Sequence, residues 1–327
     1  MNMAGKFTIS LLVTITVIAS IIILSGSSSP TRRVANSAGA IKHTSFRIIE
    51  ITQGNYLHEG VHVRFDDPQH DDIANIGFIL GEKCVAVIDT GGSVKIGQEL
   101  HEAIRSITDL PICYVINTHV HFDHVLGNLA FVDEKPAFIG HAGLADAIEA
   151  NRAFFLEQFT EDLGPDPSEK SVVGPDKTVE NTLELDLGGR TLLLTAYPTA
   201  HSHADLTVLD QKTKTLWAGD LLFRERIPSL DGSLKGWLSA MDELKSYDVD
   251  YVIPGHGPSS SNWPEVMTAQ EIYLNMLLDE TRQAIANGLF MEEAIETIGN
   301  TEKEKWLLFD QHHRSNISRV FIELEWE

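Results

Sequence analysis

The feature of this sequence that most constrains its fold is a group of metal-binding side chains directly behind a short apolar run. The run at residues 113–117 is typical of a β-strand, and the segment after it, residues 118–124, reads T-H-V-H-F-D-H. Four side chains of this segment can bind a metal: His119, His121, Asp123 and His124. Because they follow a strand, they belong to a loop at a strand end, where side chains can converge.

The types and spacing of these residues favour two metal ions. Histidine nitrogens and carboxylate oxygens are both good zinc ligands, at about 2.0–2.2 Å from the ion. His119 and His121 alternate by two and can point the same way from an extended chain. Asp123 and His124 lie past the turn and can face a second ion. A chance His-rich loop is the plain alternative, but the full H-x-H-x-D-H pattern behind a strand favours metal binding.

Three downstream segments offer further ligands, each again at an expected strand end. His201 opens the segment H-S-H-A-D, Asp220 closes W-A-G-D, and His256 closes I-P-G-H. A single Gly-Asp or Gly-His in a turn is usually structural. Together with the first group, however, these residues give seven ligands, the right number for two ions and a shared oxygen. His203 lies two residues from His201 and could also reach a metal.

The order of these motifs resembles the metallo-β-lactamase superfamily. The resemblance rests on H-x-H-x-D-H, H-S-x-x-D, G-D and P-G-H-G, together with Asp89 in V-I-D-T-G, and covers about residues 46–260. It implies an α/β fold, the αββα four-layer sandwich of the metallo-β-lactamase type, with the metals at one edge. It also implies two metal ions per chain. We expect zinc, with iron or manganese as alternatives.

The resemblance also assigns the ligands. It implies that the first metal is bound by His119, His121 and His201. The second metal is then bound by Asp123, His124 and His256. Asp220 matches the carboxylate that bridges the metals in glyoxalase II-like and lactonase-like members. His201 is favoured over His203 because its offset of four residues to Asp205 matches the family pattern. His203 is then expected behind the ligands or on the surface, and Asp89 behind the ligands, where it would help to orient them.

Within the superfamily, the chain most resembles the SoxH-like proteins, also called quinoprotein relay system zinc metallohydrolases. The stretches that carry this resemblance are residues 74–78, 115–121, 198–206, 230–237 and 323–327. It implies an exported, hydrolase-like protein and adds no substrate chemistry. Lactamases with a cysteine at the second metal would need it at Asp220, where neither Cys84 nor Cys113 lies. Hydrolysis of another ester, a thioester or a lactone is therefore favoured over dedicated β-lactamase activity.

These residues predict a dinuclear metal-dependent hydrolase that attacks an ester, thioester, lactone or related small molecule through a metal-bridging hydroxide. Asp220 and Asp123 are the expected catalytic residues: Asp220 fixes the metal pair, and Asp123 or a metal-bound water returns the proton. One alternative is a mononuclear iron persulfide dioxygenase that uses only His119, His201 and Asp220. The other is a non-enzymatic exported protein that binds a metal or cofactor for a quinoprotein dehydrogenase.

The charge of the chain argues against nucleic acid as a partner. There are 47 acidic and 25 basic residues, which give a formal net charge of −22. A surface this acidic repels phosphate backbones, and the sequence shows no basic groove. A small-molecule substrate is therefore expected.

The first 45 residues are expected to direct the chain to its compartment. Residues 7–24 carry no charge and are followed by S-G-S-S-S-P. Residues 1–25 thus predict a signal peptide or a membrane anchor, and residues 26–45 a linker. We expect an exported protein, in the periplasm or anchored to the membrane facing it, with a dehydrogenase as a candidate partner. Residues 46–260 are the expected catalytic domain, and residues 261–327 a helical extension packed on it.

Short apolar runs broken by glycine, proline and aspartate predict mixed structure. The expected strands are residues 47–52, 61–65, 76–80, 84–89, 113–117, 183–187, 190–197, 206–209, 215–218 and 251–253. Helices are expected at residues 94–107, 142–163 and 235–245, and over most of the chain from residue 263, with breaks near Gly288 and Gly299. This order predicts two packed sheets with helices outside.

Several residues outside the motifs also carry expectations. Cys84 and Cys113 each head an apolar run, so they form either one disulfide or two buried thiols. Among the other histidines, His141 is expected on the surface, and His312 with His313 in a polar loop between helices rather than in the pocket. The aromatic side chains expected in the core rather than in the substrate cleft are Phe154, Phe155 and Trp237.

Overall fold

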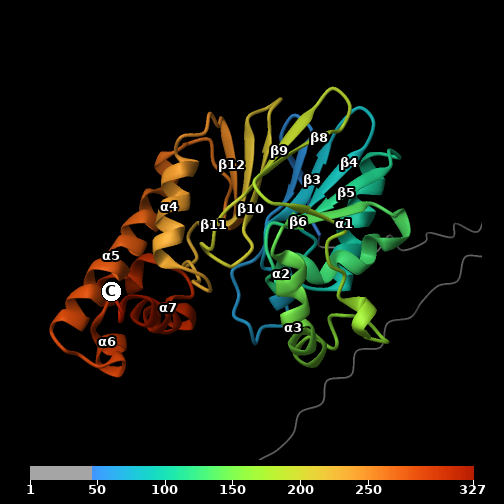
Figure 1. Ribbon diagram of the computed structural model, residues 1–327. Helices are drawn as coiled ribbons and strands as arrows, with labels where there is room; N and C mark the ends of the chain where they lie inside the picture. The colour runs from blue at the N-terminus through green and yellow to red at the C-terminus, as the bar shows by residue number, and fades with distance from the viewer. Residues whose placement is uncertain (1–45) are drawn as a thin grey trace, which may run out of the picture. The chain divides into compact units, whose positions relative to one another are not determined.

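Two β-sheets form the centre of the computed structural model, which describes residues 46–327 (Figure 1). The first sheet has seven strands side by side in chain order: β1 (Ile49–Thr52), β2 (Asn55–His58), β3 (Ile76–Leu80), β4 (Val85–Ile88), β5 (Ile112–Ile116), β6 (Ala137–His141) and β7 (Lys177–Val179). Neighbours from β1 to β4 are antiparallel, whereas those from β4 to β7 are parallel. The carboxyl ends of β4 and β5 therefore lie at the same edge.

The second sheet has five strands, in the order β12 (Tyr251–His256), β11 (Thr215–Phe223), β10 (Leu206–Asp210), β9 (Thr191–Ala196) and β8 (Thr182–Asp186). Neighbours from β8 to β11 are antiparallel, and β11 and β12 are parallel. The strands β9, β11 and β12 consequently run the same way, and their carboxyl ends lie at one edge of this sheet.

The core between the sheets is formed by side chains at alternate positions of the strands. In β9, Leu192 and Leu194 are fully buried, whereas Leu193 between them is partly exposed. Both buried leucines belong to one apolar cluster with Ile79 and Ile116 of the first sheet. Successive side chains of a strand point to opposite faces, so this alternation is what joins the two sheets.

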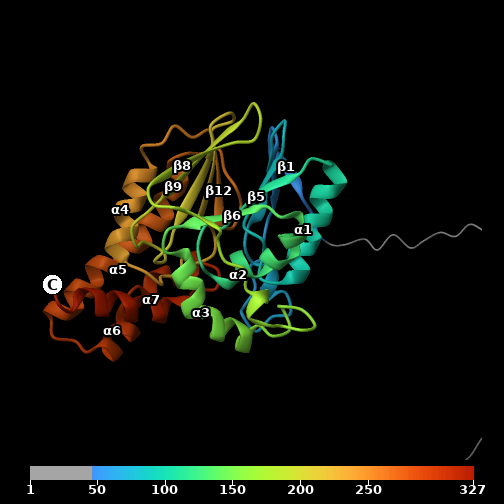
Figure 2. The same cartoon turned by 45° about the vertical axis from the view of Figure 1, so that its right-hand side comes forward.

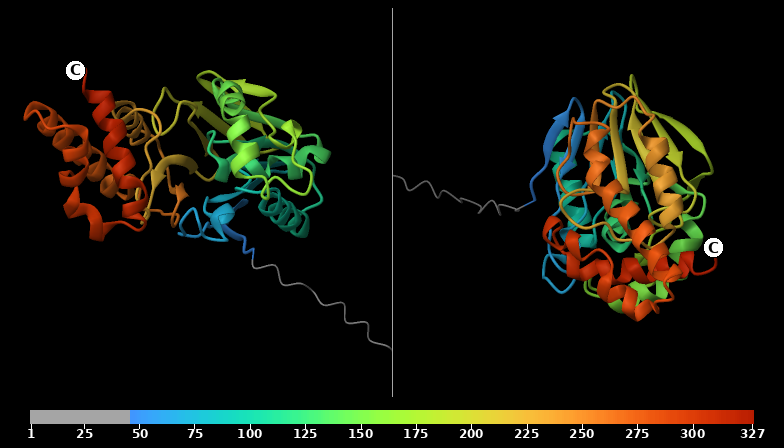
Figure 3. Two further views of the ribbon diagram at one scale, coloured as in Figure 1. Left: turned by 90° about the horizontal axis from the view of Figure 1, so that it is seen from below. Right: turned by 90° about the vertical axis from the view of Figure 1, so that its left-hand side faces the viewer.

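Helices cover the outer faces of both sheets. The first sheet is covered by α1 (Val94–Ile107), which buries Ile96, Leu100 and Ile104 against it. Figure 2 shows α1 and α4 (Leu234–Leu244) on opposite sides of the sheets. In the right panel of Figure 3, α4 and α5 (Thr268–Ala286) lie in front of the second sheet. The order helix, sheet, sheet, helix confirms the predicted αββα sandwich.

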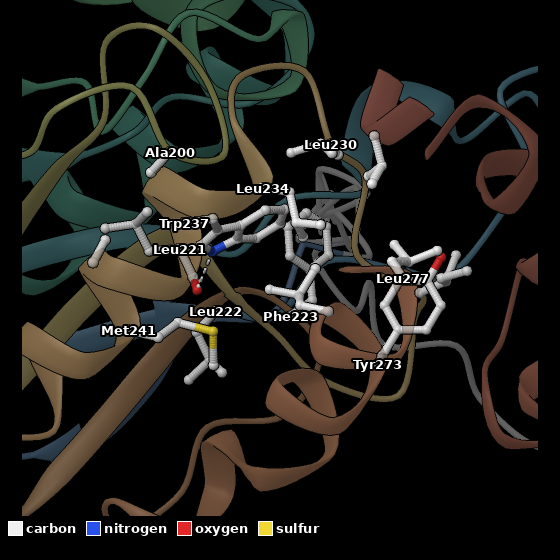
Figure 4. Packing of buried hydrophobic residues seen from close by; sticks show 14 of the residues in the cluster. Ala200, Leu221, Leu222, Phe223, Leu230, Leu234, Trp237, Met241, Tyr273 and Leu277 are labelled. Carbon is white, nitrogen blue, oxygen red and sulfur yellow. Dashed lines mark hydrogen bonds between the residues drawn. The ribbon is translucent and has the colours of Figure 1, made fainter. Parts of the chain in front are cut away.

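Trp237 anchors α4 on the second sheet. Its indole is fully buried beside Leu221, Phe223 and Leu234 (Figure 4). The buried Nε1–H donates to the carbonyl oxygen of Leu221 at 3.0 Å, which satisfies the one polar group of the ring. The ring centroid also lies 5.1 Å from that of His201. The apolar core thus reaches directly to an expected metal ligand.

The remaining α-helices of residues 46–327 are α2 (Phe122–Val125), α3 (Leu144–Gln158), α6 (Met291–Thr297) and α7 (Phe309–Leu324). The C-terminal part is helical, as predicted, and its breaks follow the glycines. Gly288 and Gly299 adopt φ values of 72° and 66° directly after α5 and shortly after α6. This left-handed conformation favours glycine and ends a helix.

Some predicted elements are wrong. Residues 61–65 form no strand, because the backbone leaves the sheet after β2 and the N–H of Val61 bonds to the carbonyl of Asp72. The strands β2, β6 and β7 are not predicted at all, since short strands without clear alternation give a weak pattern. Of the aromatic residues expected in the core, Phe155 and Trp237 are buried, but Phe154 is 52% exposed.

Cys84 and Cys113 form a disulfide, with their Cα atoms 5.8 Å apart, so the first of the two alternatives is the one found. It joins the residue before β4 to the neighbouring parallel strand β5. The predictions for residues 1–25 and 26–45 lie outside the described residues, and the domain boundary at residues 260/261 stays a prediction. Within residues 46–327, no helix has the length and apolar character needed to cross a bilayer.

Candidate metal centre

The seven expected ligands are carried by five segments that end at one edge of the two sheets. From the first sheet come the loop after β5, with His119 and His121, and α2, with Asp123 and His124, at the lower edge in Figure 1. The second sheet contributes residues from the loop after β9, from β11 and from the end of β12: His201, Asp220 and His256. The structure brings all seven together in two neighbouring groups.

Two glycines allow the strands to approach closely around Asp220. Gly219 has a φ of 52°, and a Cβ atom there would lie 2.7 Å from the Cβ of Thr118. A Cβ atom on Gly255 would overlap the carboxylate of Asp220. Only glycine fits both positions. The Gly-Asp and Gly-His pairs of the sequence therefore serve to insert one carboxylate between the histidines.

The first group consists of His119, His121, His201 and Asp220. The Nδ1 atom of His121 lies 3.1 Å from Nε2 of His119 and 3.0 Å from Nε2 of His201. Oδ2 of Asp220 lies 3.6 Å from Nε2 of His119 and 3.4 Å from Nε2 of His201. Three ring nitrogens and one carboxylate oxygen thus point at a common centre.

The second group consists of Asp123, His124 and His256. Oδ2 of Asp123 lies 3.7 Å from Nε2 of His124 and 3.4 Å from Nε2 of His256. Asp220 reaches this group as well, with Oδ1 at 3.2 Å from His124 Nε2 and Oδ2 at 3.3 Å from His256 Nε2. Its carboxylate therefore stands between the two groups.

Each histidine is held by a hydrogen bond on the side away from the centre. In four rings the donor is the Nδ1–H group. His119 donates to the Thr118 hydroxyl (3.0 Å) and His124 to the Asp89 carboxylate (2.8 Å). His201 donates to the Ser229 carbonyl (2.7 Å) and His256 to the Ile73 carbonyl (2.7 Å). His121 is reversed, since its Nε2–H points to Asp231 at 3.3 Å. Such bonds fix the tautomer and leave the other nitrogen free to bind a metal.

This arrangement fits divalent metal ions. His121 carries its ring proton on Nε2 and His201 on Nδ1, where each donates to a partner away from the centre. The other two nitrogens, Nδ1 of His121 and Nε2 of His201, therefore face each other with their lone pairs across 3.0 Å. Within residues 46–327, Nε2 of His124 and Oδ1 of Asp220 are buried without a hydrogen-bond partner. Facing lone pairs repel each other unless a cation lies between them. Imidazole nitrogen and carboxylate oxygen are the donors that zinc prefers.

Burial and charge shift the pKa values of these groups in different directions, since burial alone would lower those of His121 and His124 but the nearby carboxylates raise them. Burial lowers the pKa of His201 to about 3 and holds that of His119 well below its usual value. For Asp220, burial raises the pKa, but the neighbouring histidines, His256 first, outweigh this and hold it well below its usual range. Two neutral rings beside an ionised carboxylate are the forms that bind a metal.

Comparison with known proteins identifies the family. The sequence profile of the metallo-beta-lactamase superfamily matches residues 71–256, more than half of the 327 residues and the whole span from the first expected ligand to the last. The chain belongs to the metallo-β-lactamase superfamily. Its closer placement among SoxH-like proteins stays a prediction.

Among curated proteins, the linear primary-alkylsulfatase of Pseudomonas sp. (strain ATCC 19151) is 22% identical over 251 residues, which cover 65% of this chain and 47% of that protein. The chain thus spans about half the length of this relative. A solved stereoselective inverting sec-alkylsulfatase from Pseudomonas sp. aligns with a TM-score of 0.64 and 16% identity, over 85% of this chain and 50% of that one. These relatives are hydrolases.

A metallo-beta-lactamase from Pontibacter korlensis aligns with a TM-score of 0.56 and 18% identity, over 70% of this chain and 99% of that one. At identities this low, the two solved structures show that the fold is shared.

The residues expected behind the ligands divide into two cases. Asp89 lies where it was predicted: its carboxylate accepts hydrogen bonds from the backbone N–H of Thr118 and from Nδ1–H of His124, both at 2.8 Å. His203 takes the second of its two expected positions, on the surface: its ring is exposed and only Nδ1 approaches the Thr199 hydroxyl, at 3.4 Å. The segment at residues 198–204 is bent rather than extended, so His201 and His203 face different sides although they are two residues apart.

Other residues of the site were not predicted, because they come from the loop after β11. Ser229 and Asp231 hold His201 and His121, and Nη1 of Arg226 lies 3.1 Å from Nδ1 of His256. The stretch 230–237 contributed to the family resemblance, but its pattern assigns no contact to Asp231. Only the fold brings this loop to the histidines.

The prediction for His312 and His313 was wrong. Both residues lie within α7 rather than in a loop between helices. His313 is buried and its Nε2 bonds to the carbonyl of Ile298 at 2.9 Å. His312 points toward the site, where its Nε2 lies 3.4 Å from Nη2 of Arg226. The third histidine outside the motifs, His141, is half-buried, and its Nδ1 accepts a hydrogen bond from the N–H of Gly143.

Proposed function

We propose that this protein is a dinuclear metal-dependent hydrolase that cleaves an ester, thioester, lactone or related bond of a small molecule. The observation that carries the proposal is the position of Asp220. Its two carboxylate oxygens lie between 3.2 and 3.6 Å from nitrogens of both ligand groups. One carboxylate shared between two complete groups fits a pair of adjacent metals.

The chain supplies orientation, shielding and a proton carrier. When bound, the two metals, which we propose to be zinc, polarise the scissile bond and activate a water molecule. Phe223 stacks on His256 with centroids 5.0 Å apart, and Trp237 packs against His201, so water is excluded from behind these rings. Asp123 is the carboxylate that we propose to pass a proton to the leaving group.

The complete second group favours this proposal over a mononuclear iron dioxygenase. An oxygenase that uses His119, His201 and Asp220 has no need of a second buried group. Here Asp123, His124 and His256 are all buried and converge. Two bound metals per chain would support the hydrolase, whereas one iron per chain would support the oxygenase. Elemental analysis of the purified protein decides between them.

The decisive experiment is a hydrolysis screen of the metal-loaded protein. The panel contains an ester, a thioester, a lactone, a β-lactam and, because a relative is an alkylsulfatase, an alkyl sulfate ester. We expect turnover of at least one substrate outside the β-lactams, and its loss on chelation with recovery on adding zinc. Two tightly bound metals without turnover of any substrate would contradict the proposal. That outcome would favour a metal-binding accessory of a dehydrogenase.

We also propose that the chain is exported, either to the periplasm or to the membrane facing it. The Cys84–Cys113 disulfide supports this, because disulfides persist in oxidising compartments. Fractionation of cells that express the full chain or residues 26–327 tests it. We expect the full chain in the periplasmic or membrane fraction and the shorter chain in the cytoplasm. Equal distribution of both chains would contradict the proposal.

A further inference from the structure

Asn75 is a buried residue that joins the first sheet to the turn that carries His256. It lies directly before β3, and only 2% of its surface is exposed. Its Nδ2 group donates to the carbonyl oxygens of Pro254 at 2.8 Å and of Gly257 at 2.7 Å. Its backbone N–H donates to the carbonyl oxygen of Gly255 at 2.8 Å. Three hydrogen bonds from one residue therefore hold the backbone on both sides of His256.

The same short segment also holds the ring of His256. The carbonyl oxygen of Ile73, two residues before Asn75, accepts the hydrogen bond from Nδ1–H of His256 at 2.7 Å. Residues 73–75 thus bind both the backbone around His256 and the outer nitrogen of its ring. The position of the turn relative to the Ile73 carbonyl consequently decides where the free Nε2 points.

The other end of the Asn75 amide supports the Ile73 carbonyl. Its Oδ1 accepts a hydrogen bond from the N–H of Gly60 at 3.1 Å. Gly60 packs so closely on Ile73 that a Cβ atom at residue 60 would lie 2.5 Å from the Ile73 carbonyl oxygen. An amide side chain offers two N–H donors and an acceptor oxygen at once. Here both donors hold the turn around His256, and the acceptor holds the chain that packs on the partner of its ring.

We propose that Asn75 is a positioning residue for the second metal, because it holds His256 with Nε2 facing Asp123 and Asp220. This role rests on the proposed dinuclear function and adds a residue outside the ligand set. Nε2 of His256 lies 3.4 Å from Oδ2 of Asp123 and 3.3 Å from Oδ2 of Asp220. A shift of the turn would change both distances. None of the three histidines of the first group belongs to this turn, so that group should be spared.

The first test measures metal binding and needs no turnover. The affinities for both zinc ions are measured by chelator competition in the wild type and in Asn75→Ala. The variant is expected to bind one zinc ion at least about tenfold more weakly, as is typical for residues behind ligands, and the other unchanged. Wild-type affinity for both ions in the folded variant would overturn the proposal.

Asn55→Ala is the matched control. Asn55 is also buried and also makes three side-chain hydrogen bonds, since Nδ2 donates to Asp210 and Thr213 and Oδ1 accepts from Nε1–H of Trp217. None of these partners is an expected ligand. Both variants should lower the urea midpoint, but Asn55→Ala should keep both zinc affinities. Equal weakening of zinc binding in the two variants would show an effect of general stability and would overturn the proposal.

Asn75→Asp separates the two donors from the volume of the side chain. The carboxylate keeps the acceptor for Gly60 but offers no N–H to Pro254 and Gly257. It is expected to weaken the same zinc ion at least as much as Asn75→Ala does, and wild-type affinity would overturn the proposal. If neither variant folds, Asn75→Ser, which keeps one donor, takes their place. Unchanged zinc affinity in that variant would overturn the proposal as well.

The second test shows whether the ring of His256 itself is affected. Exchange of the Nδ1–H protons with water is measured by NMR on protein with isotope-labelled histidine, and His256→Asn and His201→Asn identify the two signals by their loss. His201 is the internal reference, because its Nδ1–H also donates to a backbone carbonyl at 2.7 Å. Asn75→Ala should exchange several-fold faster at His256 and like the wild type at His201. Unchanged exchange at His256 would overturn the proposal.

The outcomes separate the role of Asn75 from the proposed function. Two zinc ions that are both unaffected by Asn75→Ala would contradict the positioning role alone. A zinc ion whose affinity depends on Asn75, without turnover of any substrate in the hydrolysis screen, would contradict the hydrolase alone.

Discussion

The two ligand groups are similar in composition but are held by different parts of the molecule. The outer partner of His124 is Asp89, which is 1% exposed and follows β4 directly. The outer partner of His121 is Asp231, whose side chain is 40% exposed and lies in the loop after β11. The second group therefore depends on the core between the sheets, and the first group depends on a surface loop.

The loop that serves the first group is fixed by the C-terminal helix α7. Asn316 of α7 accepts a hydrogen bond from the N–H of Leu230 at 2.9 Å and donates one to the carbonyl of Pro228 at 2.7 Å. Arg319 of the same helix forms an ion pair with Asp231. In the left panel of Figure 3, the red α7 lies next to the yellow-brown loops that follow the second sheet. The C-terminal extension thus takes part in positioning ligands, although it contributes none of the seven.

Asp220→Asn should have the largest effect, because it alters both groups at once. The amide retains one acceptor oxygen and loses the charge that offsets the surrounding histidines. Metal content measured by mass spectrometry should fall for both ions, and activity should fall by more than the roughly 100-fold that is typical of residues behind ligands. Loss of only one metal would show that Asp220 belongs to a single group.

Asp89→Asn should affect the second group more than the first. An amide cannot accept from both Thr118 and His124, so a buried donor is left unsatisfied at a cost of about 1–3 kcal/mol. The affinity of the second metal should fall by about 10- to 100-fold in a chelator competition assay. Asp210→Asn is the control, since this buried carboxylate bonds to Asn55 and Thr213, away from the site. It should lose stability and keep both metals.

Asn316→Ala should weaken only the first group. The N–H of Leu230 loses its acceptor, and the loop that carries Ser229 and Asp231 is no longer fixed to α7. We expect the first metal to bind about tenfold more weakly, at the lower end of the range for such partners, while the second is unchanged. Arg319→Ala removes only an exposed ion pair, worth about 0–1 kcal/mol, and should change less. Equal weakening of both metals would remove the distinction between the two groups.

Removal of the disulfide should have the smallest effect on the metals. Cys84 lies before β4 and Cys113 at the start of β5, whereas the ligands follow the other end of β5. The double variant Cys84→Ala/Cys113→Ala should lower the free energy of unfolding by about 2–4 kcal/mol in a urea titration. Metal content and activity at room temperature should not change. Metal loss without unfolding would show that the first sheet transmits strain to the site.

The ligand types, their order and the α/β class were predictable from the sequence because they are encoded locally. An apolar run sets a strand, and the residues that follow it lie at the strand end, as for His119 and His256, whereas Asp220 lies within β11 because that strand continues to Phe223. The same local logic failed at residues 61–65, where the chain leaves the sheet and bonds to Asp72 instead. It also left His201 and His203 as alternatives, because spacing alone does not show which of the two side chains faces the metal site.

The tertiary structure alone decided which groups act on the ligands from outside. Asp231 reaches His121 across 110 residues, and His312 reaches Arg226 across 86. Contacts at such separations depend on how sheets, loops and α7 pack, and they leave no periodic pattern in the sequence. The sequence by itself therefore determined that this chain gathers histidines and aspartates at strand ends. Packing decided how each ring is turned and which ligand group relies on the surface.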